Sequence, residues 1–385
     1  MDYITRTAEA DIRSRLFKRK AVIVFGPRQS GKTTMIRHLV RDMEKETLWL
    51  NGDAPDVQAA MESVTVAKWR QIIGKKTVVV IDEAQRIANV GMAMKLVTDE
   101  LPGVQLIASG SSAFDLAGKT SEPLTGRALE YRLLPLSFEE MAAHYGLLAE
   151  KGCREQRLLF GSYPEIVGHQ ADAQRLLGSL AGSYLYKDLL MLDGLKKPSL
   201  LGKLIRVVAL QLGSEVKTSE LAALTGADNK TVDRYLDLLE KSFVLFALPA
   251  FSRNARNEIK KGRKIYFHDI GIRNAVLGNF TPLASRADAG GMWENYLVLE
   301  RLKSQCNLSF PPRRYFWRTL DQREVDYIEE TADGLRAYEF KSNPGTKAKI
   351  PAAFTNAYPD AVCGIVTPDN YEGFVSGSCC KQEDR

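Results

Sequence analysis

The first 140 residues alternate short apolar, β-branched runs with longer stretches in which apolar residues recur at helical spacing. The runs predict strands at 21–25, 47–51, 77–81, 104–109 and 128–134. The stretches between them predict helices after residue 32, over 59–73 and through Met94 and Leu96. Strands that alternate with helices favour an α/β fold, with a parallel sheet covered on both faces.

The rest of the chain has a different pattern. Residues 137–212 are mostly helical, and residues 213–252 predict a helix-turn-helix followed by a wing-like hairpin, with Gly226 in the turn. From Lys264 onward an α/β pattern returns, with a helix over 291–303. Strands are predicted at 264–269, near 325–329 and 335–341, and at 362–367.

Composition limits the class of protein. The chain has 385 residues, of which 45% are hydrophobic and 26% charged, as in a globular protein with a sizeable core. It contains no apolar stretch long enough to span a membrane, and its first residues do not resemble a signal peptide. Five cysteines without a C-x-x-C pair fit a reducing environment, so we expect a cytoplasmic protein that does not enter the membrane.

Residues 26–33, Gly-Pro-Arg-Gln-Ser-Gly-Lys-Thr, fit the phosphate-loop pattern G-x-x-x-x-G-K-[ST]. The loop leaves a predicted buried strand and enters a predicted helix, so backbone N–H groups and the helix N-terminus face a bound phosphate. We expect Lys32 to reach the β- and γ-phosphates of ATP, and the Thr33 hydroxyl to bind Mg²⁺. The predicted nucleotide-binding residues are Gly26, Pro27, Arg28, Gln29, Ser30, Gly31, Lys32, Thr33 and Thr34.

Two acids end the third predicted strand, at the sheet edge where the phosphate loop also lies. Asp82 is the expected Mg²⁺ ligand, and Glu83 the expected base that orients and deprotonates the attacking water. Ser111, after the next strand, is the candidate sensor of the γ-phosphate, although a plain strand-end turn explains it nearly as well. Arg127 either stabilises the transition state, in its own chain or from a neighbouring subunit of a homo-oligomer, or is a surface arginine.

Six segments together resemble a widespread group of prokaryotic AAA-like phosphate-loop ATPases that carry a C-terminal domain of unknown function. The segments are GPRQSGKTT, VVVIDEAQ, LIASGSS, LTGRALEYRLLPLSFEE, GSYPEIV and YFHDIGIRNAVLG. The resemblance spans residues 18–370 and implies an ATPase core, a winged helix and a restriction-endonuclease-like end domain. The expected divisions are an ATPase domain at 1–145, a helical lid or linker at 146–212, a winged helix-turn-helix at 213–252, a nuclease-like domain at 253–375 and a polar tail at 376–385.

A second group of charged residues lies near the C-terminus. Glu339 and Lys341 are two apart on a predicted strand and share a face, and Asp326 precedes them on the preceding strand. With Glu294 from the helix, they resemble the D-x(n)-E-x-K core of the PD-(D/E)xK nucleases. The resemblance implies metal-assisted phosphodiester hydrolysis, or a binding surface that has lost this activity.

Candidate DNA contacts remain open to two interpretations. The second helix of the helix-turn-helix carries Lys230, Arg234 and Lys241 but also Asp233 and Glu240, so the alternative is a winged helix that contacts protein. Residues 253–264 form a more basic segment. We therefore expect an ATPase coupled to a DNA-facing C-terminal half. The alternatives are a regulatory switch that acts through protein contacts, and an ATP-controlled nuclease.

Overall fold

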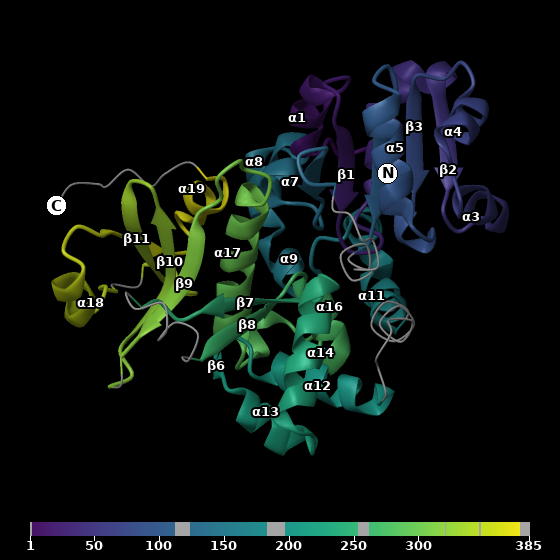
Figure 1. Ribbon diagram of the computed structural model, residues 1–385. Helices are drawn as coiled ribbons and strands as arrows, with labels where there is room; N and C mark the ends of the chain where they lie inside the picture. The colour runs from purple at the N-terminus through teal and green to yellow at the C-terminus, as the bar shows by residue number, and fades with distance from the viewer. Residues whose placement is uncertain are drawn as a thin grey trace. The chain divides into compact units, whose positions relative to one another are not determined.

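The computed structural model describes residues 2–111, 124–182, 197–252, 262–319, 321–345 and 348–377. The chain divides into two compact units (Figure 1), and each is described by itself. Unit 1 comprises Met1–Leu136 with Lys241–Phe243, and unit 2 comprises Ser137–Glu240 with Val244–Arg385. The N-terminal segment of unit 1 thus ends at Leu136, before the boundary expected at 145. The helical residues predicted at 146–212 belong with the C-terminal half.

Unit 1 is built on a five-stranded parallel sheet, as the sequence predicts, with strand order β2-β3-β4-β1-β5. Its strands are β1 (Ala21–Phe25), β2 (Thr47–Asn51), β3 (Val78–Asp82), β4 (Gln105–Gly110) and β5 (Ala128–Arg132). Its α-helices are α1 (Ala8–Arg15), α2 (Lys32–Leu39), α3 (Pro55–Met61), α4 (Val66–Ile73) and α5 (Val90–Glu100), and the 3₁₀ turns are η1 (Arg41–Glu46) and η2 (Ala84–Arg86).

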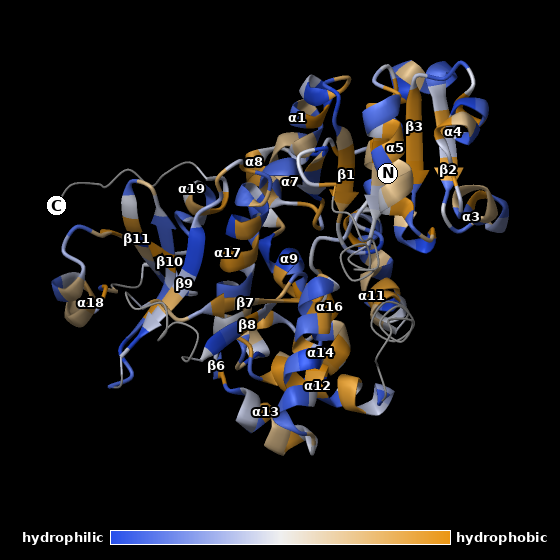
Figure 2. Ribbon diagram, viewed as in Figure 1, coloured by the Kyte–Doolittle hydropathy of each residue, from blue (hydrophilic) through white to orange (hydrophobic). Residues whose placement is uncertain are grey.

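Both faces of this sheet are buried, which explains its continuous apolar strands. Ile23 and Phe25 share a hydrophobic cluster with residues of α4 and α5, whereas Val22 and Val24 share one with residues of α1 and α2. Figure 2 shows the resulting hydrophobic colour along β1 and β3. The single helix predicted over 59–73 is wrong: α3 ends at Met61, and Thr65 caps a new helix by accepting a hydrogen bond from Lys68 N at 3.2 Å.

Unit 2 begins with helices and ends with strands. Its α-helices are α7 (Phe138–Tyr145), α8 (Leu147–Gly152), α9 (Arg154–Phe160), α10 (Pro164–Gly168), α11 (Ala173–Gly182), α12 (Pro198–Leu210), α13 (Thr218–Thr225), α14 (Asn229–Lys241), α16 (Ile270–Leu277), α17 (Ala289–Gln305), α18 (Ala352–Ala357) and α19 (Tyr371–Val375). Its strands are β6 (Glu215–Val216), β7 (Leu245–Pro249), β8 (Arg263–Phe267), β9 (Arg313–Arg318), β10 (Glu324–Thr331), β11 (Gly334–Phe340) and β12 (Val362–Val366), and its 3₁₀ turns are η3 (Gln170–Asp172) and η5 (Leu283–Ser285).

Strand β8 pairs with β7 and β6 in an antiparallel sheet next to the predicted helix-turn-helix. Helices α13 and α14 meet at Gly226, and Asp228 accepts a hydrogen bond from Thr231 N at 2.9 Å. The predicted boundary at 253 therefore falls between two paired strands. Residues 253–261 lie outside the described residues, as does most of the predicted tail.

The last sheet has the order β12-β11-β10-β9, with β10 antiparallel to both neighbours and β12 parallel to β11. The predicted hairpin around Asp333 and Gly334 is thus present. The register of β10 against β9 shifts between Val325 and Ile328, which marks a β-bulge in the segment that contains Asp326. A bulge re-aims the side chains around it, so it affects the direction of the acidic residues on β10.

Two motifs without an evident chemical role contact each other in unit 2. The Asp269 carboxylate accepts hydrogen bonds from Ser162 N at 2.8 Å and from Ile272 N at 3.1 Å. Gly161 has φ +70°, and a Cβ there would lie 2.1 Å from Asp269 Oδ1. The segment GSYPEIV therefore wraps around the first residues of HDIGIRNAVLG, and its glycine is required by the close approach.

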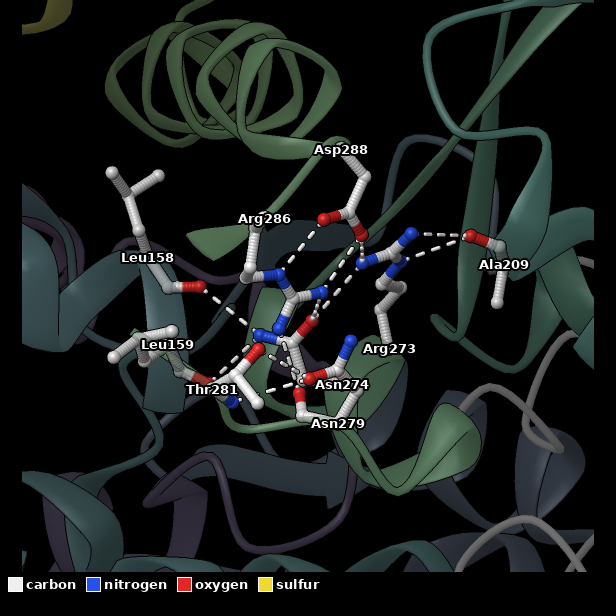
Figure 3. A network of polar contacts seen from close by, with 9 residues as sticks. All are labelled: Leu158, Leu159, Ala209, Arg273, Asn274, Asn279, Thr281, Arg286 and Asp288. Carbon is white, nitrogen blue, oxygen red and sulfur yellow. Dashed lines mark hydrogen bonds and ion pairs between the residues drawn. The ribbon is translucent and has the colours of Figure 1, made fainter. Parts of the chain in front are cut away.

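The second half of the HDIGIRNAVLG segment holds several helices together through a buried polar network (Figure 3). Asn274 Nδ2 donates to Leu159 O at 2.9 Å, and the Arg273 guanidinium donates twice to Ala209 O at the end of α12. Hydrogen bonds from Arg286 and from Arg273 hold the pKa of Asp288 well below its usual range. These residues thus fix helix α16 against α9 and α12.

We predict that Asn274→Ala destabilises this region by roughly 2–4 kcal/mol, because buried donors and acceptors lose their partners. Amide hydrogen exchange resolved along the chain should show faster exchange in α16 and α9. Thr281→Val is the control, since it removes an exposed hydrogen bond to Asn279 and should cost less than about 0.5 kcal/mol. Equal protection in the two variants would contradict this role of Asn274.

Candidate functional site

The phosphate loop connects β1 to α2, as predicted. Gly26 lies so close to β5 that a Cβ would be 2.0 Å from Leu133 O, so a larger residue does not fit. Arg6 is buried and donates to Ser30 O at 2.8 Å and to Leu134 O at 2.5 Å. The loop is therefore held by the residues that follow β5.

Lys32 is the buried cation of the loop. Its ammonium donates to Gly26 O at 2.8 Å and to Pro27 O at 2.7 Å. Burial lowers the pKa of Lys32 to about 8, although the nearby Glu83 and Asp82 carboxylates oppose this effect. Thr34, also predicted to bind nucleotide, is exposed in the first turn of α2.

Asp82, at the end of β3, contacts the phosphate loop directly. The Thr33 hydroxyl donates to Asp82 Oδ2 at 2.9 Å, which brings together the two predicted Mg²⁺ ligands. Ser109, at the end of β4, donates to Asp82 Oδ1 and accepts from Glu83 N at 3.3 Å. This role of Ser109 was not predicted from the sequence. The residue's position near the end of a strand that lies between β3 and β1 could have indicated it.

Glu83 follows Asp82 in the left-handed region, with φ 50°, which is unusual for a residue other than glycine. Its carboxylate accepts a hydrogen bond from Gln85 Nε2 at 2.5 Å. Such a backbone conformation is often kept where it directs a functional side chain.

Two other predicted residues lie elsewhere. Arg127 immediately precedes β5, at the amino end of a parallel sheet whose carboxyl end carries the phosphate loop, and it pairs with Asp99 at 2.7 Å. It therefore does not serve the loop of its own chain, and the alternatives of a surface arginine and of a contact with a neighbouring subunit stay open. Ser111 follows β4 and is half-buried; Ser109, rather than Ser111, contacts Asp82.

The C-terminal acidic residues converge, as the sequence predicts. Lys341 Nζ lies 2.7 Å from Glu339 Oε1, and Asp326 Oδ2 accepts from Phe340 N at 2.8 Å. Burial raises the pKa of Asp326, and Lys264 and Lys341 oppose that shift. Burial also raises the pKa of Glu294, on α17, to about 7, with Lys264 lowering it and Asp326 raising it.

Three members of this cluster were not recognised as such in the sequence. Lys264 Nζ lies 2.7 Å from Glu294 Oε1, contacts Glu324 and lies 3.9 Å from Asp326 Oδ1. The Tyr266 hydroxyl donates to Glu294 Oε1 at 2.6 Å. Lys264 and Tyr266 are two apart on β8 and share one face of the strand. This spacing was the available signal that both could reach the same site.

The prediction of a basic, DNA-facing segment at 253–264 is wrong for the part that the structure describes, residues 262–264. Lys264 is only 1% exposed and bound to carboxylates, so it is not part of a DNA-binding surface. Arg263 pairs with Asp233 at 3.0 Å and lies 3.9 Å from Glu240. Across the described residues, no group of three or more His, Cys, Asp or Glu side chains could hold a metal ion.

Comparison with protein families identifies the class of the N-terminal part. Residues 18–142 match the profile of an AAA domain. Residues 154–283 and 289–376 match two domains of unknown function, DUF8612 and DUF4143. The N-terminal part is therefore similar to AAA ATP-binding domains, and the two regions that follow are similar to domains of unknown function, which confirms the resemblance in these respects.

Two relatives that align over most of the chain are bacterial proteins described as uncharacterized. One from Mycobacterium tuberculosis is 27% identical over 91% of this chain and 77% of its own, and one from Haemophilus influenzae is 23% identical over 81% and 80%. The crystal structure of Bacteroides Pif1 bound to single-stranded DNA aligns at 13% identity and a TM-score of 0.26, over 46% of this chain and 50% of that one. This TM-score is too low to indicate a shared fold. No helix in the described part of the chain is long and apolar enough to cross a membrane.

The pKa of Lys32 leads to a prediction for nucleotide affinity. Since the ammonium form predominates below about pH 8 and the neutral amine above it, ATP affinity should be steady up to pH 8. It should then fall by as much as about tenfold per pH unit, because binding must restore a proton. Calorimetric titration with ATP between pH 7 and 10 measures this, with Lys32→Ala as a weak-binding control that lacks the decline. A flat profile for the native protein would exclude the role assigned to Lys32.

Proposed function

We propose that this protein hydrolyses ATP at the loop of residues 26–34 and that the nucleotide state controls a nucleic-acid-facing C-terminal half. The observation that carries the ATPase assignment is the contact between the Thr33 hydroxyl and the Asp82 carboxylate. It joins the end of β3 to the start of α2 and places two oxygen ligands beside the buried Lys32 ammonium. Oxygen ligands of this kind are those that Mg²⁺ prefers.

Each residue of the site then has a defined role. The backbone N–H groups of the loop, other than at Pro27, and the ammonium of Lys32 would hold the phosphates, and Thr33 and Asp82 would hold Mg²⁺. When bound, Mg²⁺ neutralises charge that develops between the β- and γ-phosphates. Glu83 accepts the proton of the attacking water, and Ser109 positions Asp82 through its hydroxyl. Ser111 remains a predicted sensor without a described contact.

Hydrogen bonds connect the phosphate loop to the segment of the chain that leads into the C-terminal half. Arg6 joins Ser30 O to Leu134 O, and unit 1 ends shortly afterwards, at Leu136. A change in the loop on phosphate binding therefore acts on the segment from which unit 2 begins. This supports coupling between nucleotide state and the C-terminal half.

The nucleic-acid assignment rests on α14. Arg263 pairs with Asp233 and lies 3.9 Å from Glu240, so its single charge offsets part of their negative charge. Lys230 and Arg234 are exposed, as is Asp237. The helix thus presents more positive charge than its sequence indicates, and we assign it as the DNA-facing helix of a winged helix. The competing function, a switch that acts through protein contacts, predicts the opposite result in the DNA experiment below.

We predict that Glu83→Gln still binds ATP but turns it over about 10²-fold or more slowly, because the amide cannot accept the proton. Steady-state phosphate release and fluorescent-nucleotide binding measure the two properties separately. Glu100→Gln makes the same chemical change at the exposed end of α5 and should turn over ATP normally. Normal turnover by Glu83→Gln would show that the base is another group.

For DNA, we predict that reversing the charge of Lys230 and Arg234 to glutamate weakens binding roughly tenfold or more at low salt, because phosphate contacts are lost. Fluorescence anisotropy with single- and double-stranded oligonucleotides tests this, together with stimulation of ATP turnover by the same DNA. Arg175→Glu, at an exposed position of α11, is a control that reverses one charge, and Lys230→Glu alone is the single variant to compare with it. If the double variant binds DNA and responds to it like the native protein, the protein-contact switch is the better description.

A further inference from the structure

The carboxylates near the C-terminus surround one buried lysine. Lys264 is 1% exposed, and its ammonium reaches Glu294, Glu324 and Asp326. These acids come from two elements of the fold, α17 and β10, while the lysine comes from β8. A single ammonium thus lies where carboxylates from separate segments meet.

Several of the oxygens that would bind a metal are already engaged. Glu294 Oε1 accepts from both Lys264 and the Tyr266 hydroxyl. Asp326 Oδ2 accepts from Phe340 N, and its other oxygen faces Lys264. Glu339 Oε1 accepts from Lys341 at 2.7 Å, whereas the buried Glu339 Oε2 has no hydrogen-bond partner among the described residues.

Each acid of the cluster also has a cation nearby, although three cations face five carboxylates. Arg318 lies 3.4 Å from both Glu324 and Glu215, which leaves each carboxylate of the group with a lysine or arginine within 4 Å. Burial by itself would lower the pKa of Lys264, but Glu294, Glu324 and Asp326 together raise it well above its usual value. The ammonium therefore stays charged, and a divalent cation placed beside it would be repelled.

The D-x(n)-E-x-K resemblance implies a metal here, and the arrangement does not fit one. We propose that the Lys264 ammonium is the resident cation of this cluster, in the place where a divalent metal would bind. The cluster then stabilises unit 2 by joining β8 to α17 and β10, and it does not bind Mg²⁺ or Mn²⁺ while Lys264 is present. The C-terminal sheet accordingly lacks metal-dependent cleavage activity.

The test compares Mn²⁺ binding by full-length native protein and three variants: Asp326→Asn, Lys264→Met and the double variant. Free Mn²⁺ is followed by electron paramagnetic resonance without nucleotide, and thermal unfolding is followed with and without Mn²⁺. Native protein and Asp326→Asn should bind the same amount of Mn²⁺, since any binding at the ATP site is common to both. Binding by the native protein that Asp326→Asn removes would overturn the proposal.

Lys264→Met keeps the length of the side chain but removes its charge. It should lower the unfolding temperature by roughly 10 °C, because buried carboxylates lose their partner. It should also gain Mn²⁺ binding that the double variant lacks, and Mn²⁺ should restore part of the lost stability. A folded Lys264→Met that gains no Mn²⁺ would show that the lysine does not occupy a metal position. If this variant does not fold, the native and Asp326→Asn comparison decides by itself.

Discussion

Buried charge that must be matched is the constraint on which the C-terminal unit depends. Its interior contains several ion pairs in which both side chains are almost inaccessible to water, and removing one partner of such a pair usually costs about 3–5 kcal/mol. The pairs are Arg157 with Glu150, Arg301 with Glu329 and Lys303 with Glu300. The first two pairs join different elements, α9 to α8 and α17 to β10, so they restrict how the helices and the last sheet can pack.

The two buried lysines show how surroundings decide what a cation can do. Lys32 donates to backbone carbonyls and has no carboxylate at ion-pair distance among the described residues, and its burial lowers its pKa to about 8. Lys264 lies among carboxylates, and its pKa is raised. The first lysine has much to gain from an incoming phosphate, whereas the second already has its anions. The same residue type thus serves ligand binding in one unit and internal cohesion in the other.

Local patterns were enough to predict much of the fold. The five strands of unit 1, the phosphate loop and the β10–β11 hairpin follow from apolar runs and turn residues close together in the chain. The partners of Asp82 and Asp326 were harder to predict, because Ser109 and Lys264 approach them from distant strands. Lys264 was misread as part of a basic surface, since a sequence window shows its neighbour Arg263 but not the acids on α17 and β10. The division between units was also missed, since it depends on which helices pack together.

The bulge in β10 has a consequence for reading related sequences. It adds a residue between Val325 and Ile328 relative to β9, and side chains alternate along a strand. A relative that lacked this extra residue would keep the letters Asp, Glu and Lys, yet would turn the acid at one end of the strand to the opposite face. Alignment of those letters would not reveal the difference. In such sequences, the number of residues between the positions of β10 that pair with β9 therefore shows better than the acidic residues whether the carboxylates meet.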